Sequence, residues 1–404
     1  MTSSLLAEIL RPGDHVLVAQ GTGEPVSLIA ELFDLAPRLG ALNVFCGLQL
    51  NTAWEGDVPD AVRVSTYCGM GAVRKLVAQQ RARVIPASLP QLSSFIASRK
   101  LPVDVVLLQV SPADADGYHS LGCTLDYVWD AVQVARVVVV EVNARIPITR
   151  GIGRLHRSRV FVARESNEPL LESPVETPSE VQRQVARHVA GLVPDGATLQ
   201  LGIGGLAGAV AGALKKHRGL KIRSGLVGDW FLDLHESGAL DTTTPGACLA
   251  ALVVGSSSLY ASLSREGLLG FAPATQLVIP IPGSPLMAIN SAIEVDLCGQ
   301  VSAEFLGERY VGAVGGQTDY FRAARVSEGG LAILAMPSTT GGQTAKSRIV
   351  PRCSYVTSTQ SDIDMIVTEF GVADIRATTL QERSALIADI ANPQARAGLL
   401  LAES

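Results

Sequence analysis

The sequence predicts an α/β protein made of two tandem, internally duplicated open α/β domains. Three observations support this fold class. At 404 residues, the chain exceeds the usual size of a single domain. Runs of β-branched residues alternate with helical segments, as in parallel sheets covered by helices. A stretch near the start of the chain is echoed in its second half, which indicates an internal duplication.

The composition is that of a chain that folds throughout. It contains 47% hydrophobic and only 18% charged residues, and no segment has the low hydrophobicity of disorder. The longest apolar stretches, residues 247–254 and 137–140, are far shorter than the roughly 20 residues that cross a bilayer. The start of the chain, Met1 to Ser4, lacks a basic segment followed by a long apolar one, so no secretory signal is predicted. The expected location is the cytoplasm.

Cysteine usage and charge exclude two classes of function. No CxxC pair and no Cys/His spacing suits zinc, so free thiols and no metal are expected. A net charge of −5 offers no basic face for a nucleic acid backbone. The six cysteines are scattered singly: Cys46, Cys68, Cys123, Cys248, Cys298 and Cys353.

A segment rich in glutamate and proline, residues 164–178, predicts the boundary between the domains. The expected domains are residues 1–170 and 177–404. A helix is predicted immediately after the boundary, with Thr177 as N-cap and Pro178 in the first turn. Its apolar face is expected to comprise Val181, Val185, Val189 and Leu192.

The duplication is visible when residues 11–26 are placed over residues 194–209. Each copy reads as a turn, a strand, a Gly-rich loop and a helix, followed by a further strand at residues 42–46 or 220–223. Ligands of open α/β sheets gather beyond the carboxyl ends of strands, so a site between the two domains is expected. Other predicted strands are residues 103–110, 136–142, 249–254, 331–336 and 364–367.

Three Gly-rich loops are candidates for ligand binding. Gly202, Gly204 and Gly205 follow a strand and open a helix, which suits an anion or simply a tight turn. The two adjacent glycines Gly315 and Gly316, in the loop 312–319, could present backbone donors to an oxyanion or a pantetheine chain, or form an ordinary turn. The loop from Ser338 to Gln343 could hold phosphate, although its composition favours a flexible surface loop.

Several blocks in this order resemble the acetyl-CoA hydrolase/transferase family, and in particular its 4-hydroxybutyrate CoA-transferases. The resemblance extends from about residue 10 to 395. The blocks are Gln109 to Gly122, Glu141 to Pro147, Leu201 to Gly205, Ile289 to Gln300, Val314 to Gln317, Ser347 to Pro351 and Val367 to Arg376.

The resemblance implies a class I CoA-transferase fold and a ping-pong mechanism in which a glutamate attacks the CoA thioester. In the family this glutamate follows a strand of the second domain. Aligned on Ile222 and Asp229, this sequence has Gly225 at that position. Glycine has no side chain that could attack, and the downstream carboxylates Asp229, Asp233 and Glu236 match other family positions. We therefore expect that no glutamyl-CoA intermediate forms.

The resemblance also implies residues that line the thioester and acyl pocket. These are Asn290, Gly315, Gly316, Gln317 and Glu369. Two side chains in the first half could supply substitute chemistry. Cys68 could be a nucleophile if its pKa were depressed, or a small buried hydrophobe. His119 could be a general base, or an unremarkable polar residue after a turn.

The function expected is an acyl-CoA-dependent enzyme that passes the acyl group directly to an external nucleophile, as an acyltransferase or thioester hydrolase. Three alternatives stay open: a conventional acyl-CoA:carboxylate CoA-transferase, a catalytically degenerate acyl-CoA-binding or partner subunit, and an acyl-CoA decarboxylase. The expected partners are acyl-CoA, a small-molecule acceptor and a second copy of the chain in a homodimer. A coenzyme A thioester is expected as substrate, with no covalently bound cofactor, no nucleic acid and no membrane.

Overall fold

The computed structural model describes residues 5–149, 151–264, 268–342 and 345–401. The chain forms two compact units. One comprises Met1–Pro174, Leu249–Leu277 and Tyr310–Gly315, and the other comprises Val175–Cys248, Val278–Arg309 and Gly316–Ser404. The start of the chain and Gln343 lie outside the described residues, so the expectations stated for them have no structural counterpart.

A seven-stranded sheet has the order β4-β3-β2-β1-β5-β7-β9, and its neighbouring strands run parallel. β5 is buried at every position because helices cover both faces of a parallel sheet. The strands are β1 (His15–Val18), β2 (Leu42–Cys46), β3 (Val62–Thr66), β4 (Ala82–Val84), β5 (Val105–Val110), β7 (Val137–Asn143) and β9 (Phe161–Ser166).

Helix α2 shows how local sequence sets the element boundaries in this part. It begins after Pro25 and ends at Leu39, and the C-cap residue that follows is Gly40, whose φ of 99° favours glycine. Its buried side chains include Leu28, Ile29 and Leu32, which recur at helical spacing. The helices of this part are α1 (Leu5–Ile9), α2 (Val26–Leu39), α3 (Arg74–Ala78), α4 (Leu89–Ala97) and α5 (Asp126–Val134), with 3₁₀ turns η1 (Gly21–Gly23), η2 (Thr52–Glu55) and η3 (Arg157–Arg159).

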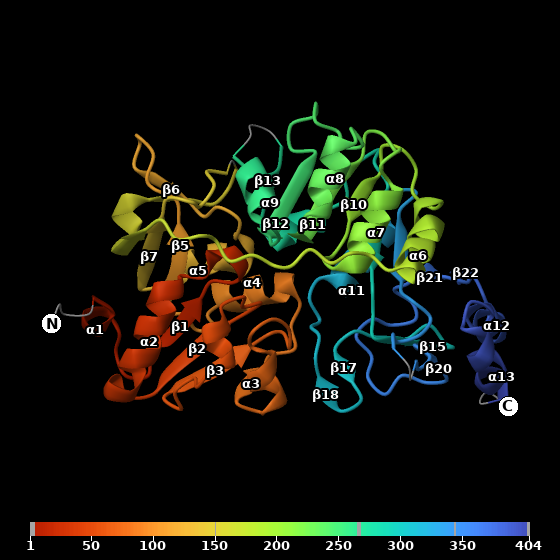
Figure 1. The fold of residues 1–404 in the computed structure, drawn as a ribbon, viewed down its shortest axis with the longest axis horizontal. Coiled ribbons are helices and arrows are strands. Elements are labelled where there is room, and N and C mark those ends of the chain that lie inside the picture. The colour runs from red at the N-terminus through yellow and green to blue at the C-terminus, as the bar shows by residue number, and fades with distance from the viewer. Residues whose placement is uncertain (1–4, 150, 265–267, 343–344, 402–404) are drawn as a thin grey trace. The chain divides into compact units, whose positions relative to one another are not determined.

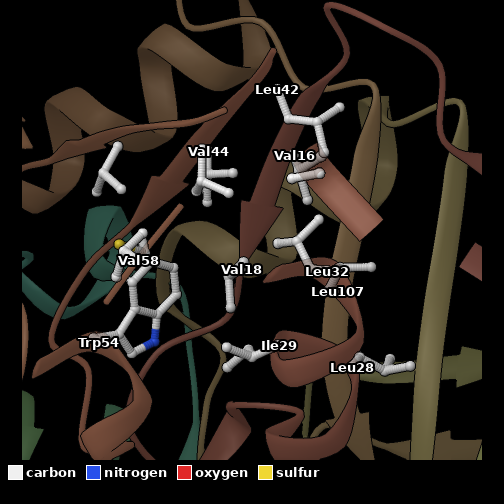
Figure 2. Packing of buried hydrophobic residues seen from close by; sticks show 14 of the residues in the cluster. Val16, Val18, Leu28, Ile29, Leu32, Leu42, Val44, Trp54, Val58 and Leu107 are labelled. Carbon is white, nitrogen blue, oxygen red and sulfur yellow. The ribbon is translucent and has the colours of Figure 1, made fainter. Parts of the chain in front are cut away.

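The hydrophobic core of this part lies between α2 and the central strands. Figure 2 shows Leu28, Ile29 and Leu32 of α2 with valines of β1 and β2, and with Trp54 beside Val58. Trp54 is fully buried, and its ring meets Phe33 edge to face with a centroid distance of 5.0 Å. This core packs α2 against the central strands of the sheet.

An eight-stranded sheet has the order β13-β12-β11-β10-β14-β19-β21-β22. The pairs β10–β11, β10–β14, β12–β13, β14–β19 and β19–β21 are parallel, and β21–β22 is an antiparallel hairpin. The strands are β10 (Thr198–Gln200), β11 (Lys221–Val227), β12 (Cys248–Val253), β13 (Gly270–Phe271), β14 (Leu286–Asn290), β19 (Leu331–Ala335), β21 (Met365–Thr368) and β22 (Gly371–Asp374).

The remaining elements are helices of the second half and three small sheets, of order β16-β15-β20, β17-β18 and β6-β8. The helices are α6 (Glu180–Ala190), α7 (Gly205–Ala213), α8 (Trp230–Glu236), α9 (Ser257–Ser262), α10 (Ala274–Leu277), α11 (Gln317–Val326), α12 (Leu380–Asp389) and α13 (Pro393–Leu401). The small-sheet strands are β6 (Tyr118–Ser120), β8 (Arg154–His156), β15 (Glu294–Asp296), β16 (Val301–Ser302), β17 (Phe305–Leu306), β18 (Arg309–Tyr310) and β20 (Ile349–Val350).

The predicted fold class, two duplicated and mostly parallel α/β assemblies, is confirmed. In each sheet the first strand of the repeat is central: β1 lies between β2 and β5, and β10 lies between β11 and β14. The strand–helix–strand runs β1–α2–β2 and β10–α7–β11 can be followed in Figure 1. In both sheets, the strand that precedes the Gly-rich loop is therefore a central strand, with further strands on either side.

Two details of the predicted boundary region are wrong. Helix α6 has Ser179 as its N-cap, not Thr177, because the Ser179 hydroxyl accepts from the Gln182 N–H at 3.2 Å while the Gln182 side chain accepts from the Ser179 N–H at 2.8 Å. Val181 is 39% exposed and lies outside the buried face, which contains Val185 and Val189.

Segment 249–253 returns to the first unit and hydrogen-bonds to its loop 123–125. The N–H of Leu125 donates to the carbonyl of Ala251 at 2.8 Å, and the N–H of Val253 donates to the carbonyl of Cys123 at 2.8 Å. Chain positions more than a hundred residues apart therefore complete the same compact unit.

Candidate active site

Polar side chains follow four neighbouring parallel strands of the eight-stranded sheet. Gln200 ends β10, Asn290 ends β14, Ser338 follows β19, and Glu369 follows β21. Parallel strands present their carboxyl ends at one edge of a sheet, where open α/β proteins bind ligands. This edge is the candidate active site.

Asn290 is held by a reciprocal pair of amide hydrogen bonds. Its Nδ2 donates to Gln200 Oε1 at 2.6 Å, and Gln200 Nε2 donates to its Oδ1 at 3.2 Å. The next residue, Ser291, accepts at its carbonyl from Gln317 Nε2 at 3.1 Å. Asn290 and Gln317, both predicted site residues, are therefore anchored at adjoining points of the chain, one by the Gln200 side chain and the other by the Ser291 carbonyl.

Glu369 accepts two hydrogen bonds from a single residue. The backbone N–H of Ser338 lies 2.8 Å from Oε2, and the Ser338 hydroxyl lies 2.6 Å from Oε1. Burial lowers the pKa of the neighbouring Arg348 guanidinium, and the charge of Glu369 opposes that shift. Arg348 Nε donates to the Ile293 carbonyl at 3.0 Å, and its Nη2 donates to the Ala292 carbonyl. Glu369 is thus fixed beside a partly buried cation.

A cavity of about 610 Å³ adjoins these residues. Its wall contains Thr339, Thr340 and Gly341, so the described part of the predicted 338–343 loop lines a cavity instead of being only a surface loop. The start of α6 and Arg348 complete the polar part of the wall. The full lining is Ser179, Val181, Gln182, Ile293, Pro337, Thr339, Thr340, Gly341 and Arg348.

The Gly202–Gly205 loop opens α7, as predicted. Gly204 has a φ of 95°, in the region that favours glycine. The N–H of Gly205 donates to Oε2 of Glu176 at 2.8 Å, so the anion at this helix start is a side chain of the chain itself. A Cβ at Gly205 would lie 3.0 Å from the Gln182 side-chain amide. The close packing of Gln182 against this position therefore explains why the residue is a glycine. The carbonyl of Gly202 accepts from Trp230 Nε1 at 2.8 Å.

Gly225 lies within β11, which is longer than the predicted strand at residues 220–223. It is buried, and the preceding Ser224 hydroxyl donates to the Leu201 carbonyl of the adjacent chain segment at 2.5 Å. β11 runs parallel to β10, so Gly225 lies toward the same carboxyl edge. Of the downstream carboxylates, Asp233 pairs with Lys215 Nζ at 2.7 Å on the surface.

The Gly315–Gly316 turn precedes α11. Gly315 has a φ of 59°, and its carbonyl accepts from the Leu89 N–H at 2.9 Å. Gly316 is the N-cap residue of α11, and a Cβ there would lie 3.1 Å and 3.2 Å from carbons of the Tyr320 ring. The two glycines therefore serve different purposes: a left-handed turn at Gly315 and close ring packing at Gly316.

Cys68 and His119 are both buried within the first unit. Cys68 is 0% exposed, and burial raises the pKa of its thiol to about 11, against the lowered value that a nucleophile needs. His119 has its Nδ1 2.7 Å from the Ser111 carbonyl. These surroundings support the alternatives of a small buried hydrophobe and a structural histidine.

Sequence reasoning missed two buried carboxyl groups at the carboxyl edge of the seven-stranded sheet. Glu24 accepts from the N–H groups of Leu50 and Asn51, and burial raises its pKa to about 8. Asp126 accepts from Gln20 Nε2 at 2.6 Å, and burial raises its pKa to about 6. The position of Glu24 directly after the Gly-rich turn at residues 21–23 was the available signal.

Within the described parts of the chain, no group of three or more His, Cys, Asp or Glu side chains could hold a metal ion. Among the same residues, no helix has the length and apolar character needed to cross a membrane. The six cysteines are free, four of them buried.

The duplicated open sheets, with polar residues at a shared carboxyl edge, define an α/β protein of the kind that binds a ligand beyond its strand ends. Models of the acetyl-CoA hydrolase/transferase N-terminal and C-terminal domains match residues 1–156 and 255–402. The chain belongs to the acetyl-CoA hydrolase/transferase family, and the resemblance described above is thereby confirmed. The members of this family are transferases and hydrolases that use CoA thioesters, as expected. Gly225 lies between the two matched segments.

Relatives with similarity over almost the whole chain agree with this assignment. The 4-hydroxybutyrate coenzyme A transferase of Clostridium kluyveri is 33% identical over 96% of this chain and 92% of its own. The succinyl-CoA:acetate/propanoyl-CoA:succinate CoA transferase of Fasciola hepatica is 30% identical over 96% of this chain and 84% of its own. The crystal structure of RipA from Yersinia pestis superposes with a TM-score of 0.91 at 28% identity, covering all of this chain and 96% of that one.

Proposed function

We propose that the protein is an acyl-CoA-dependent enzyme that transfers the acyl group of a bound CoA thioester directly to an external nucleophile, without a glutamyl-CoA intermediate. The observation that carries the proposal is Gly225. Aligned on Ile222 and Asp229, it falls at the position that the family resemblance assigns to the glutamate, and a glycine provides no carboxylate to attack the thioester.

In the proposed reaction, the nucleophile forms a bond to the thioester carbonyl carbon, and the carbon–sulfur bond then breaks. The proton of the nucleophile ends on the released CoA thiol. Water as nucleophile gives a carboxylic acid and CoA, whereas an amine gives an amide and CoA. The proposed binding groups for the thioester are backbone donors at Gly315 and Gly316 and the side-chain amides of Asn290 and Gln317. Gly202, Gly204 and Gly205 are proposed to contact the coenzyme, where a phosphate would compete with the Glu176 carboxylate.

The proposal is tested by incubating the purified chain with a panel of acyl-CoA thioesters, with and without candidate acceptors. Loss of thioester together with release of free CoA is the expected result. Mass spectrometry of the protein during turnover is expected to show no covalent CoA adduct. If no thioester in the panel is consumed under any condition, the enzymatic proposal is wrong.

Replacing Gly225 by glutamate is the sharpest test of the missing nucleophile. G225E restores a carboxylate at the family position, so we expect a glutamyl-CoA adduct and CoA exchange with a carboxylate acceptor, both absent from the wild type. G225Q has almost the same volume but cannot attack, and it serves as the matched control. An adduct in wild-type protein would contradict the proposal.

A conventional CoA-transferase is the second candidate, because the two relatives described above are named CoA transferases. Glu369 and Glu176 are the carboxylates that the candidate site offers, although each already accepts hydrogen bonds from the chain. A CoA adduct on Glu369 or Glu176 of wild-type protein, located by peptide mapping, would favour this candidate. E369Q and E176Q would then abolish the adduct at the respective site.

A further inference from the structure

Tyr320, on the first turn of α11, has a buried hydroxyl group that faces Gly225. The residue is 3% exposed, and within the described structure its hydroxyl has no hydrogen-bond partner of ordinary geometry. Burial raises the pKa of Tyr320 well above its ordinary value, and the backbone N–H of Gly225, which faces the phenol oxygen as a donor and not as an acceptor, opposes this rise. Tyr320 is therefore a neutral phenol that can donate a hydrogen bond at neutral pH.

The Gly-rich turn fixes the position of this hydroxyl. The Tyr320 ring packs against the backbone of Gly316, where a Cβ would lie only 3.1 Å and 3.2 Å from two ring carbons. The charged groups around the phenol are Asp319, which raises its pKa, and Arg223, which lowers it. Arg223 is itself engaged with the carbonyls of Ile222 and Ala247, both at 3.0 Å. The ring thus has little freedom to turn toward another acceptor.

A buried hydroxyl without an acceptor destabilises a protein, and a ligand oxygen placed at that point removes the penalty. We propose that the Tyr320 hydroxyl donates a hydrogen bond to the thioester carbonyl oxygen of an acyl-CoA bound beside Gly225. This inference rests on the proposed function. Negative charge grows on that oxygen when a nucleophile attacks the carbonyl carbon, so the same bond would strengthen in the transition state.

The test compares wild-type protein with Y320F, which keeps the ring and removes only the hydroxyl. Calorimetry is expected to show about tenfold weaker binding of acyl-CoA to Y320F. Binding of free CoA, which has no thioester oxygen, should be unchanged. For any thioester that the wild type consumes, kcat is expected to fall by roughly 100-fold, as for the loss of an oxyanion donor.

Thermal stability separates this role from a structural one. Because Y320F deletes an unpaired buried hydroxyl, its Tm without ligand is expected to equal or exceed that of the wild type. A lower Tm would mean that the hydroxyl supports the free protein, and the inference would be overturned. Y355F is the matched control, since Tyr355 is 41% exposed and stacks on Phe305 at a centroid distance of 3.9 Å.

The outcomes distinguish this inference from the proposed function. Equal acyl-CoA affinity and equal kcat in Y320F and wild type overturn the inference and leave the proposed function intact. Weaker binding of both acyl-CoA and free CoA also overturns it. Selective loss of acyl-CoA affinity in Y320F, with no thioester consumed by the wild type, supports the inference and contradicts the proposed function. If the wild type binds no acyl-CoA, both are wrong.

Discussion

Glu24 follows the Gly-rich turn of the first half, where the aligned position of the second half is Ala207. Its carboxyl group is fully buried, and burial raises its pKa to about 8 from an ordinary value of 4.5. The folded protein therefore binds a proton here between about pH 4.5 and pH 8 that the unfolded chain has released. It follows that the free energy of unfolding decreases as the pH rises through this range.

Replacing Glu24 by glutamine should flatten this pH dependence. E24Q keeps a neutral side chain at all pH values. The free energy of unfolding of E24Q, relative to that of the wild type, should therefore increase between pH 6 and pH 8. The gain is expected to reach a few kcal/mol, at about 1.4 kcal/mol per pKa unit. Asp126, with a pKa of about 6, acts in the same direction at lower pH.

The measurement for E24Q is urea unfolding at several pH values. E55Q, which alters an exposed glutamate of the same region, is the control and should keep the wild-type profile. Parallel profiles for E24Q and wild type would show that Glu24 does not titrate in this range.

Cys68 should resist alkylation in the native protein. Its thiol is inaccessible, and its pKa of about 11 leaves almost no thiolate at neutral pH. Cys298 is only partly buried and should react first with iodoacetamide. Peptide mapping by mass spectrometry gives the order, with unfolded protein as the control in which all six cysteines react. Rapid native labelling of Cys68 would revive its candidacy as a nucleophile.

At the scale of the element, the start of α6 depends on a capping box. S179A removes the hydroxyl that accepts from the Gln182 N–H and is expected to lower the free energy of unfolding by about 1 kcal/mol. T177A changes the residue that the sequence favours as cap and should have almost no effect. Chemical denaturation of both variants checks this, and a larger loss in T177A would contradict the structural assignment.

The sequence predicts elements well where local chemistry alone determines them. Strand β2 has the predicted bounds, and β5, β7, β12, β19 and β21 differ only by one or two residues at their ends. The start of α6 is less certain from sequence because Thr177 and Ser179 both have capping chemistry on either side of Pro178. Only the reciprocal bonds with Gln182 decide between them.

At the scale of the whole molecule, the homodimer remains a prediction. The edge strand β9 exposes Phe161 at 51% and Val162 at 45%, and apolar edges of this kind are commonly covered by a partner. Light scattering after size exclusion is expected to give twice the chain mass, and F161D should shift it toward the monomer. V326D, at a position that is 78% exposed on α11, is the control. A monomeric wild type at micromolar concentration would contradict the prediction.

The candidate site was predictable in part for a physical reason. Asn290, Gln317 and Glu369 stand at or just after strand ends or at a helix start, so their neighbourhood follows from the order of strands and loops. The hydrogen-bond partners of the site residues cannot be predicted from the order of strands and loops, because they are distant in sequence. Gln200 and Asn290 are 90 residues apart, and Glu176 and Gly205 are 29 residues apart. Tyr320 and Glu24 escaped notice since burial, which makes their chemistry unusual, depends on packing across the entire fold.

The return of segment 249–253 to the loop 123–125 bears on the order in which the protein is made. A ribosome releases the chain from its N-terminus, so the first unit cannot be finished when Pro174 emerges. It still lacks Leu249–Leu277, which is translated after residues 175–248 of the second unit, and Tyr310–Gly315, which is translated after residues 278–309 of that unit as well. In the nascent first half, the carbonyl of residue 123 and the N–H of residue 125 therefore lack their partners until segment 249–253 is made. Binding by a chaperone during this time would protect the incomplete unit.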